Sequence, residues 1–125
     1  MNEKEDPSLI SPSQTQLSSL LEHYQNGRFT DAEKLSLEII QDFPKHQFAW
    51  KVLGAVLGKT GRKSEAEAAY QTAVAFSPQD AGAHNNLGNT LKALGRLDEA
   101  LASYNQAITL KPDFVKAHSL SLIHI

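Results

Sequence analysis

The sequence contains no cysteine. Without thiols the chain forms no disulfide, builds no thiolate zinc site and has no cysteine nucleophile. A chain without cysteine suits a reducing compartment, so we expect the protein to be cytoplasmic.

An excess of charge of one sign is missing as well. The chain has 12 Lys and Arg against 14 Asp and Glu, which gives a net charge of -2. This balance offers no uniform attraction to a nucleic-acid backbone or to an anionic membrane surface. The sequence also lacks the run of about 18 apolar residues that crosses a bilayer. We therefore expect neither a nucleic-acid partner nor a membrane partner.

Residue patterns typical of catalysis, cofactor binding or metal binding are absent too. The G-K-T sequence at 58–60 follows Gly54 one residue too closely for a phosphate-binding loop. The five histidines include no i,i+4 pair of the kind that holds zinc. No serine elbow, H-E-x-x-H sequence or glycine fingerprint occurs. We therefore expect no catalytic residue, no cofactor and no metal, and the protein is predicted not to be an enzyme.

What the chain does contain is an internal repeat. Glycine, arginine, alanine and proline recur with one shared period, as Gly27, Gly61 and Gly95; Arg28, Arg62 and Arg96; Ala32, Ala66 and Ala100; and Pro44, Pro78 and Pro112. Aligned without gaps, residues 47–80 and 81–114 are identical at 12 of 34 positions, where unrelated segments of ordinary composition would share about two. The repeat divides the chain into units 13–46, 47–80 and 81–114.

Each unit is predicted to hold two helices with a glycine between them. Apolar residues recur at helical spacing on both sides of that glycine, which supplies the left-handed residue that closes the first helix, and the proline ends the second helix. Thr30 with Glu33, and Ser64 with Glu67, have the spacing of capping boxes, so we expect them to cap second helices. The predicted helices cover 13–26, 30–42, 47–60, 63–76, 81–94 and 97–110, and another helix is predicted to start at 115.

This pattern resembles that of the tetratricopeptide repeat (TPR) family. The second unit supplies Trp50, the Leu53–Gly54 pair, A-E-A-A-Y at 66–70 and Pro78. The third unit is similar, with His84 in the tryptophan place, whereas the first unit has Leu20 in the glycine place and Ser36 in the aromatic place. The resemblance implies an all-α, right-handed solenoid of antiparallel helix pairs, with three 34-residue TPR units and a truncated fourth.

The two ends of the chain differ from this repeat region. Residues 1–12 carry acids and two prolines, and we expect them to form a flexible lead. Residues 115–119 resemble the start of a fourth unit. The next six residues, 120–125, can be encoded by a sequence similar to a transposase-based sequencing adapter, so we expect them to be a non-native scar on an N-terminal fragment of a longer protein. We also expect α-helical residues 97–110 to present apolar surface to Val115, Leu120 and Leu122, with self-association through this end.

The first helices of the units carry the candidate binding residues. The resemblance implies that these helices line the concave side of the solenoid, and helical spacing aligns one stripe there, made of Lys51, Ala55, Lys59, Asn85, Asn89 and Lys92. Asn86 matches the asparagine that forms ladders in O-GlcNAc transferase arrays. Lys51, Asn86 and Lys116 match three of the five residues with which chaperone adaptors of this fold clamp a C-terminal carboxylate, while Ala55 and Leu120 depart from that set.

An amide can both donate to and accept from a peptide backbone, and a lysine can meet an acidic group. We therefore predict a non-catalytic protein–protein interaction scaffold that binds an extended peptide or partner segment in a mildly basic groove. One alternative is a substrate-docking region of a larger glycosyltransferase or sulfotransferase. Another is a chaperone-adaptor carboxylate clamp.

Overall fold

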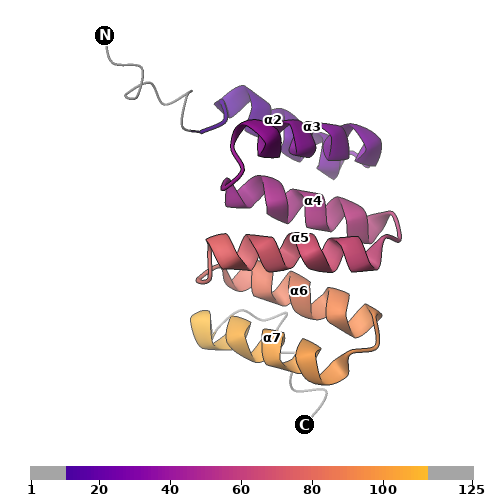
Figure 1. The fold of residues 1–125 in the computed structure, drawn as a ribbon, viewed down its shortest axis with the longest axis vertical. Coiled ribbons are helices and arrows are strands. Elements are labelled where there is room, and N and C mark those ends of the chain that lie inside the picture. Colours follow the sequence, from indigo (N-terminus) through magenta and orange to yellow (C-terminus); the bar gives the residue numbers. More distant parts are fainter. Residues whose placement is uncertain (1–10, 113–125) are drawn as a thin grey trace.

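The computed structural model describes residues 11–112, and all regular elements in this range are α-helices. Figure 1 shows them stacked in chain order from α2 to α7. Their bounds are Gln14–Gln25 (α2), Phe29–Asp42 (α3), Gln47–Lys59 (α4), Lys63–Phe76 (α5), Ala81–Ala93 (α6) and Leu97–Leu110 (α7). Each helix begins and ends within one residue of its predicted bound, and the predicted all-α solenoid is confirmed.

The glycines end the first helix of every unit as predicted. Gly27, Gly61 and Gly95 have φ of 76°, 84° and 81°, a backbone conformation that strains any residue with a Cβ. The predicted capping boxes of the second helices are wrong. An arginine stands at each N-cap and makes no side-chain cap. Thr30 and Ser64 are therefore the second residues of α3 and α5, and the two glutamates lie beyond the first turn.

Contacts join consecutive helices into a continuous stack. Helices α4 and α5, and helices α6 and α7, form the most extensive pairs, while α3 packs on α4 and α5 packs on α6 between units. The first helices also contact one another across units, α2 with α4 and α4 with α6. Because these three helices lie in one row, their shared side forms a continuous wall.

A glycine in each of the second and third units lets the two helices approach closely. A Cβ on Gly54 would lie 2.9 Å from the ring of Tyr70, and a Cβ on Gly88 would lie 2.7 Å from the ring of Tyr104. Both distances are shorter than a carbon–carbon contact allows. The tyrosine ring therefore occupies the space that the glycine leaves open.

The first unit fills the same space with a large side chain on the first helix and a small one on the second helix. Leu20 occupies the place of Gly54, Ser36 occupies the place of Tyr70, and both side chains are fully buried. Ser36 is small enough to leave room for the leucine, and its hydroxyl donates to the carbonyl of Glu33 at 2.9 Å. The departure of this unit from the repeat pattern is thus an exchange of large and small side chains across one helix pair.

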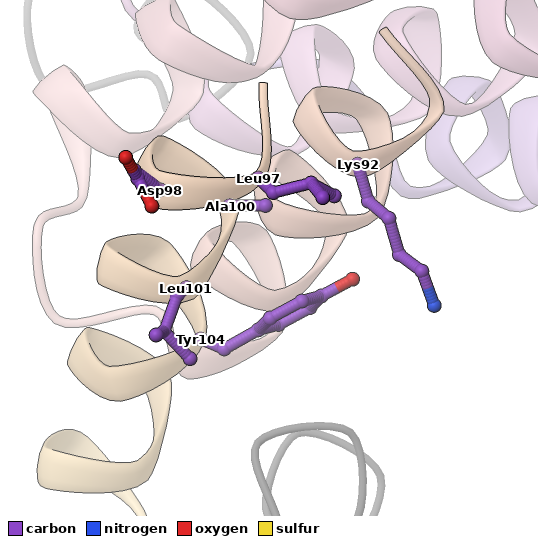
Figure 2. Close-up of a pocket in the computed structure, with 6 residues that line it drawn as sticks. All are labelled: Lys92, Leu97, Asp98, Ala100, Leu101 and Tyr104. Carbon is purple, nitrogen blue, oxygen red and sulfur yellow. The ribbon is translucent and has the colours of Figure 1, made fainter. Parts of the chain in front are cut away.

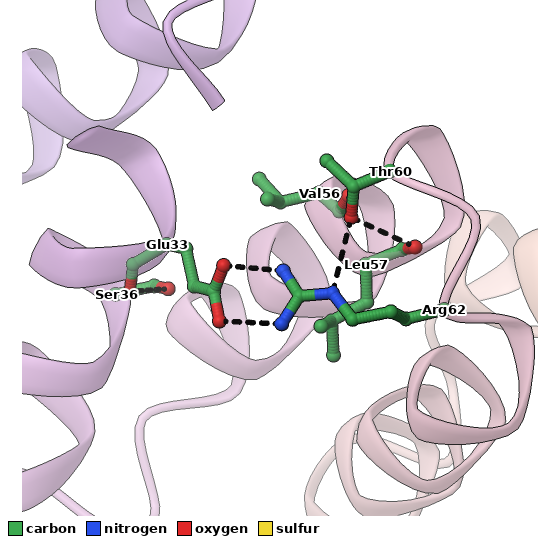
Figure 3. A network of polar contacts seen from close by, with 6 residues as sticks. All are labelled: Glu33, Ser36, Val56, Leu57, Thr60 and Arg62. Carbon is green, nitrogen blue, oxygen red and sulfur yellow. Dashed lines mark hydrogen bonds and ion pairs between the residues drawn. The ribbon is translucent and has the colours of Figure 1, made fainter. Parts of the chain in front are cut away.

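In each later unit, the arginine at the N-cap of the second helix binds a glutamate of the preceding unit. Figure 3 shows the guanidinium of Arg62 on both carboxylate oxygens of Glu33, with one Nη1–Oε2 distance of 3.0 Å. Arg96 repeats the contact with Glu67 at 2.6 Å and also binds Glu99. Hydrogen bonds from Arg62 lower the pKa of Glu33 against the opposing effect of burial. These pairs tie neighbouring units together at the turns.

The tryptophan place near the start of the first helix makes a second contact that recurs. The indole N–H of Trp50 donates to the carbonyl of Pro44 at 2.7 Å. His84 stands in the equivalent place, with its Nε2 2.9 Å from the carbonyl of Pro78. Because a carbonyl only accepts, this Nε2 carries the proton. A histidine therefore replaces the tryptophan without loss of the hydrogen bond.

Candidate functional site: the groove of the first helices

The row of first helices contains a cavity of about 350 Å³. Its walls come from three successive units, and its lining residues are Tyr24, Ala55, Gly58, Lys59, Tyr70, Asn86, Asn89 and Thr90. The lining combines small residues of α4 with amide, hydroxyl and ammonium groups. Such a mixture of apolar surface and convergent polar groups is typical of a binding site. We call this cavity and the adjoining exposed side of α2, α4 and α6 the groove.

Four of the eight predicted binding residues lie in this cavity. The structure brings together Ala55 and Lys59 of α4 with Asn86 and Asn89 of α6. Asn89 is already engaged, because its Oδ1 accepts a hydrogen bond from the hydroxyl of Tyr104 at 2.6 Å. The residues therefore share one wall, while their part in binding stays a prediction.

Lys51 lies apart from this cavity and is already paired. Its Nζ is 3.0 Å from Oδ2 of Asp80 and 3.3 Å from Oδ1. Gln47 donates to the same carboxylate at 2.8 Å, and the backbone N–H of Ala83 does so at 3.1 Å. Burial alone would raise the pKa of Asp80, but these hydrogen bonds outweigh it and hold the pKa below its usual value. The lysine thus anchors the N-terminus of α6, a role that the sequence analysis missed.

The side chain of Asn85 is buried, whereas the predicted stripe requires it to be exposed in the groove. It is only 2% exposed, so the expectation that it faces a ligand in the open groove is corrected. No hydrogen bond from the described residues reaches its Oδ1. Helical spacing placed it on the correct helix, but it could not tell a buried position from an open one.

Lys92 lines a second, smaller cavity at the far end of the described solenoid. Figure 2 shows its side chain beside Tyr104, with Leu97 and Leu101 of α7 around the same space, which measures about 220 Å³. Leu97 is 57% exposed. Lys116, together with Val115, Leu120 and Leu122, lies outside the described residues, so their predicted contacts and self-association through this end stay predictions.

The sequence analysis overlooked the tyrosines and the threonine of the groove. Tyr24 and Tyr70 both line the cavity, as does Thr90. Burial raises the pKa of the Tyr70 phenol, and the neighbouring Tyr24 raises it further. The Tyr70 hydroxyl therefore stays neutral near pH 7 and can donate a hydrogen bond. The repeat register could have indicated Tyr24, because this residue occupies the place of Gly58 and Lys92 on the first helices.

The lysines of the groove remain available to an acidic ligand. Within residues 11–112, neither Lys59 nor Lys92 forms an ion pair with a carboxylate. Their paired counterparts in that range are Lys51, Arg62 and Arg96. The open side of the groove thus carries positive charge that no carboxylate of residues 11–112 pairs with.

The G-K-T sequence at 58–60 lies at the C-terminal end of a helix. Thr60, the last residue of the G-K-T sequence, donates its hydroxyl to the carbonyl of Val56 at the end of α4, so the segment is a helix terminus. No group of three or more His, Asp or Glu residues among those described could hold a metal ion. Across the same residues, no helix combines the length and apolar character needed to traverse a bilayer.

Two family models match the chain. The model described as tetratricopeptide repeat matches residues 81–114, and a second model, described as TPR repeat, matches residues 54–95. A sequence search of curated proteins gives no match.

Similar folds occur among solved structures. A Thermobaculum terrenum O-GlcNAc transferase mutant has a TM-score of 0.86 and 30% identity over 98% of this chain. MamA has a TM-score of 0.80 and 26% identity over 91% of this chain. The first TPR of Spaghetti (RPAP3), bound to an HSP90 peptide, has a TM-score of 0.83 and 19% identity over 90% of this chain and 92% of its own. The present chain spans 23% of the transferase and 65% of MamA.

Proposed function

The chain is a tetratricopeptide repeat protein, and we propose that it is a non-catalytic interaction scaffold that binds an extended peptide or partner segment in the groove. The observation that carries this proposal is the convergence of Lys59, Asn86 and Asn89 on one cavity. Amides recognise a peptide backbone in either sense, and the unpaired lysine adds attraction for an acidic group. The solved RPAP3 domain with its HSP90 peptide is a protein of this fold that binds a peptide. The cysteine-free composition fits a cytoplasmic location for this protein.

A peptide library measured by fluorescence anisotropy tests this function. Asn86→Ala and Lys59→Glu are the informative variants, because neither side chain holds a hydrogen bond or ion pair within the described fold. Lys51→Glu is unsuitable, since it would also break the anchor to Asp80. We expect selected peptides to bind at least fivefold more weakly to both variants.

The matched control is Lys34→Glu, an exposed charge reversal on α3, outside the row of first helices. It should leave the affinity unchanged after correction for net charge. Peptides that bind equally well to the Asn86 and Lys59 variants would contradict the placement of the site in the groove.

A second candidate is a substrate-docking region of a larger transferase. The similarity that favours it is the 30% identity to the O-GlcNAc transferase over 98% of this chain. The gene read through the codons for residues 119–125 tests it, together with the prediction that residues 120–125 are a non-native scar. A transferase domain downstream would support this candidate, and further repeats alone would contradict it.

The carboxylate clamp has less support than either candidate. Lys51, which matches the clamp, is bound by Asp80. Ala55 departs from the clamp and offers no amide. Lys116 lies outside the described residues. A peptide with a free C-terminal carboxylate should therefore bind no better than its amidated form, which the same anisotropy assay measures.

A further inference from the structure

The three first helices present different chemistry at equivalent places of the groove. Leu21 of α2, Ala55 of α4 and Asn89 of α6 are separated by one repeat period each, so they occupy the same place in successive units. The leucine is 41% exposed, although a large apolar side chain is usually buried. From α2 to α6 this place therefore changes from large and apolar, through small, to polar.

A second set of equivalent places shows the same gradient. Tyr24, Gly58 and Lys92 are also one repeat period apart and lie on the same three helices. An aromatic ring is replaced first by open backbone and then by a cation. The end of the groove at α2 thus offers apolar surface. Its parts at α4 and α6 offer the charges of Lys59 and Lys92, which form no ion pair among residues 11–112.

We propose that the occupant of the groove is an extended peptide segment that carries a large apolar side chain and, a few residues away, an acidic side chain. The apolar side chain lies on Leu21 and Tyr24. The acidic side chain lies toward Lys59 and Lys92, where its charge complements theirs. This proposal rests on the proposed function and adds the chemistry and the order of the ligand.

The geometry of the stack sets the separation between the two side chains. Packed helices lie about 8–10 Å apart, and an extended chain rises about 3.3 Å per residue. A peptide that crosses from α2 to α4 therefore needs about three residues, and one that crosses from α2 to α6 needs about six. A leucine and an aspartate that are adjacent in sequence cannot reach both ends.

Synthetic peptides of one composition test this order. Each carries one leucine and one aspartate in a Gly/Ser/Asn background, in both chain directions, with the two residues adjacent or separated by three or by six positions. In anisotropy titrations at fixed ionic strength we expect the separated peptides to bind at least fivefold tighter than the adjacent ones. Replacement of the leucine by serine or of the aspartate by lysine should each remove that gain.

Two variants assign the two ends. Leu21→Asn, which gives α2 the residue that α6 carries, should remove the benefit of the leucine but keep that of the aspartate. Lys59→Glu should do the reverse and should favour the lysine peptide. The matched controls are Leu37→Asn, another exposed leucine on α3, and Lys34→Glu. Circular dichroism confirms that every variant is folded.

The outcomes separate this inference from the function on which it rests. If peptides bind, and Asn86→Ala weakens them, but separation and order have no effect, the inference is overturned while the function stands. If none of the peptides and no library member binds, both are overturned. If Leu37→Asn removes the leucine benefit as fully as Leu21→Asn does, the apolar end is wrongly placed.

Discussion

The junction between the first and second units and the junction between the second and third units occupy equivalent places in the repeat but carry different side chains. At the first junction the buried cluster is aliphatic and contains Leu20, Val52 and Val56. At the second, Asn86 and Thr90 occupy the places of the two valines and border the groove beside Tyr70. A single repeat pattern thus accommodates an apolar junction and a polar one, and the polar junction is where the groove has its amides.

The largest expected effect comes from breaking the large-for-small exchange in the first unit. Leu20→Gly removes a fully buried side chain and places glycine inside a helix, so it should lower the free energy of unfolding by about 4 kcal/mol. Adding Ser36→Tyr gives the first unit the glycine–tyrosine pair of the others and should recover part of the loss. Urea denaturation measures both, and strictly additive losses would contradict the exchange.

The second comparison concerns the two tyrosines. Tyr104→Phe leaves Asn89 without the hydroxyl that donates to it, which should cost about 1 kcal/mol. Tyr70→Phe should cost less, because Ala55 stands in the place of Asn89 and offers no acceptor. Thermal denaturation of the two matched variants checks the difference, and equal losses would show that the hydrogen bond contributes nothing to stability.

A third comparison concerns the N-caps of the first helices. Asp80 caps α6, while His46 stands in the equivalent place before α4 and makes no side-chain cap. His46→Asp should therefore raise the free energy of unfolding by about 1 kcal/mol.

The variant should also change the pH dependence of stability. Burial lowers the pKa of His46 in the folded state, so the unfolded state binds the proton more readily and stability falls as the pH drops through about 6.5.

Urea denaturation between pH 7 and pH 5 checks both points. The loss over this range should be smaller in His46→Asp than in the parent protein. His46→Gln serves as a control, since it removes the titration and adds no carboxylate cap. A parent protein whose stability is unchanged over this range would contradict the assignment to His46.

The smallest effect on stability is expected at the arginine–glutamate pairs, which both junctions share. Arg62→Gln removes the guanidinium from Glu33, and Arg96→Gln removes it from Glu67. Both arginines are substantially exposed, so each loss should be small and should shrink further in about 1 M salt, where exposed charges are screened. Melting temperatures at low and high salt measure this, and a large, salt-independent loss would contradict the description of these pairs as surface contacts.

Sequence periodicity predicts the fold closely because residues with strong local backbone preferences stand at the helix ends. Gly61 and its equivalents end the first helices, and the buried alanines and tyrosines recur at helical spacing between them. The prediction of capping boxes failed because Glu33 and Glu67 have a stronger partner 29 residues ahead in sequence, an arginine of the next unit. The arginines and these two glutamates each recur at the repeat period, so their constant separation of 29 residues could have indicated the pair.

The groove could be predicted in outline but not in detail. Register placed Ala55, Lys59, Asn86 and Asn89 on neighbouring first helices, where the structure finds them. It could not show that Lys51 is bound to Asp80, because that contact depends on how the start of α6 lies beside α4, the first helix of the preceding unit. Burial of Asn85 likewise depends on packing beyond its own helix.

The three turn glycines have a consequence for chirality. Within the described fold, a methyl group added to Gly27, Gly61 or Gly95 would meet no atom within 4 Å. The obstacle to substitution there is the sign of φ, since a mirror-image residue favours the positive values that an L residue avoids. D-Alanine, introduced by chemical synthesis, should therefore avoid the backbone strain that L-alanine meets at these turns and should restrict the unfolded chain.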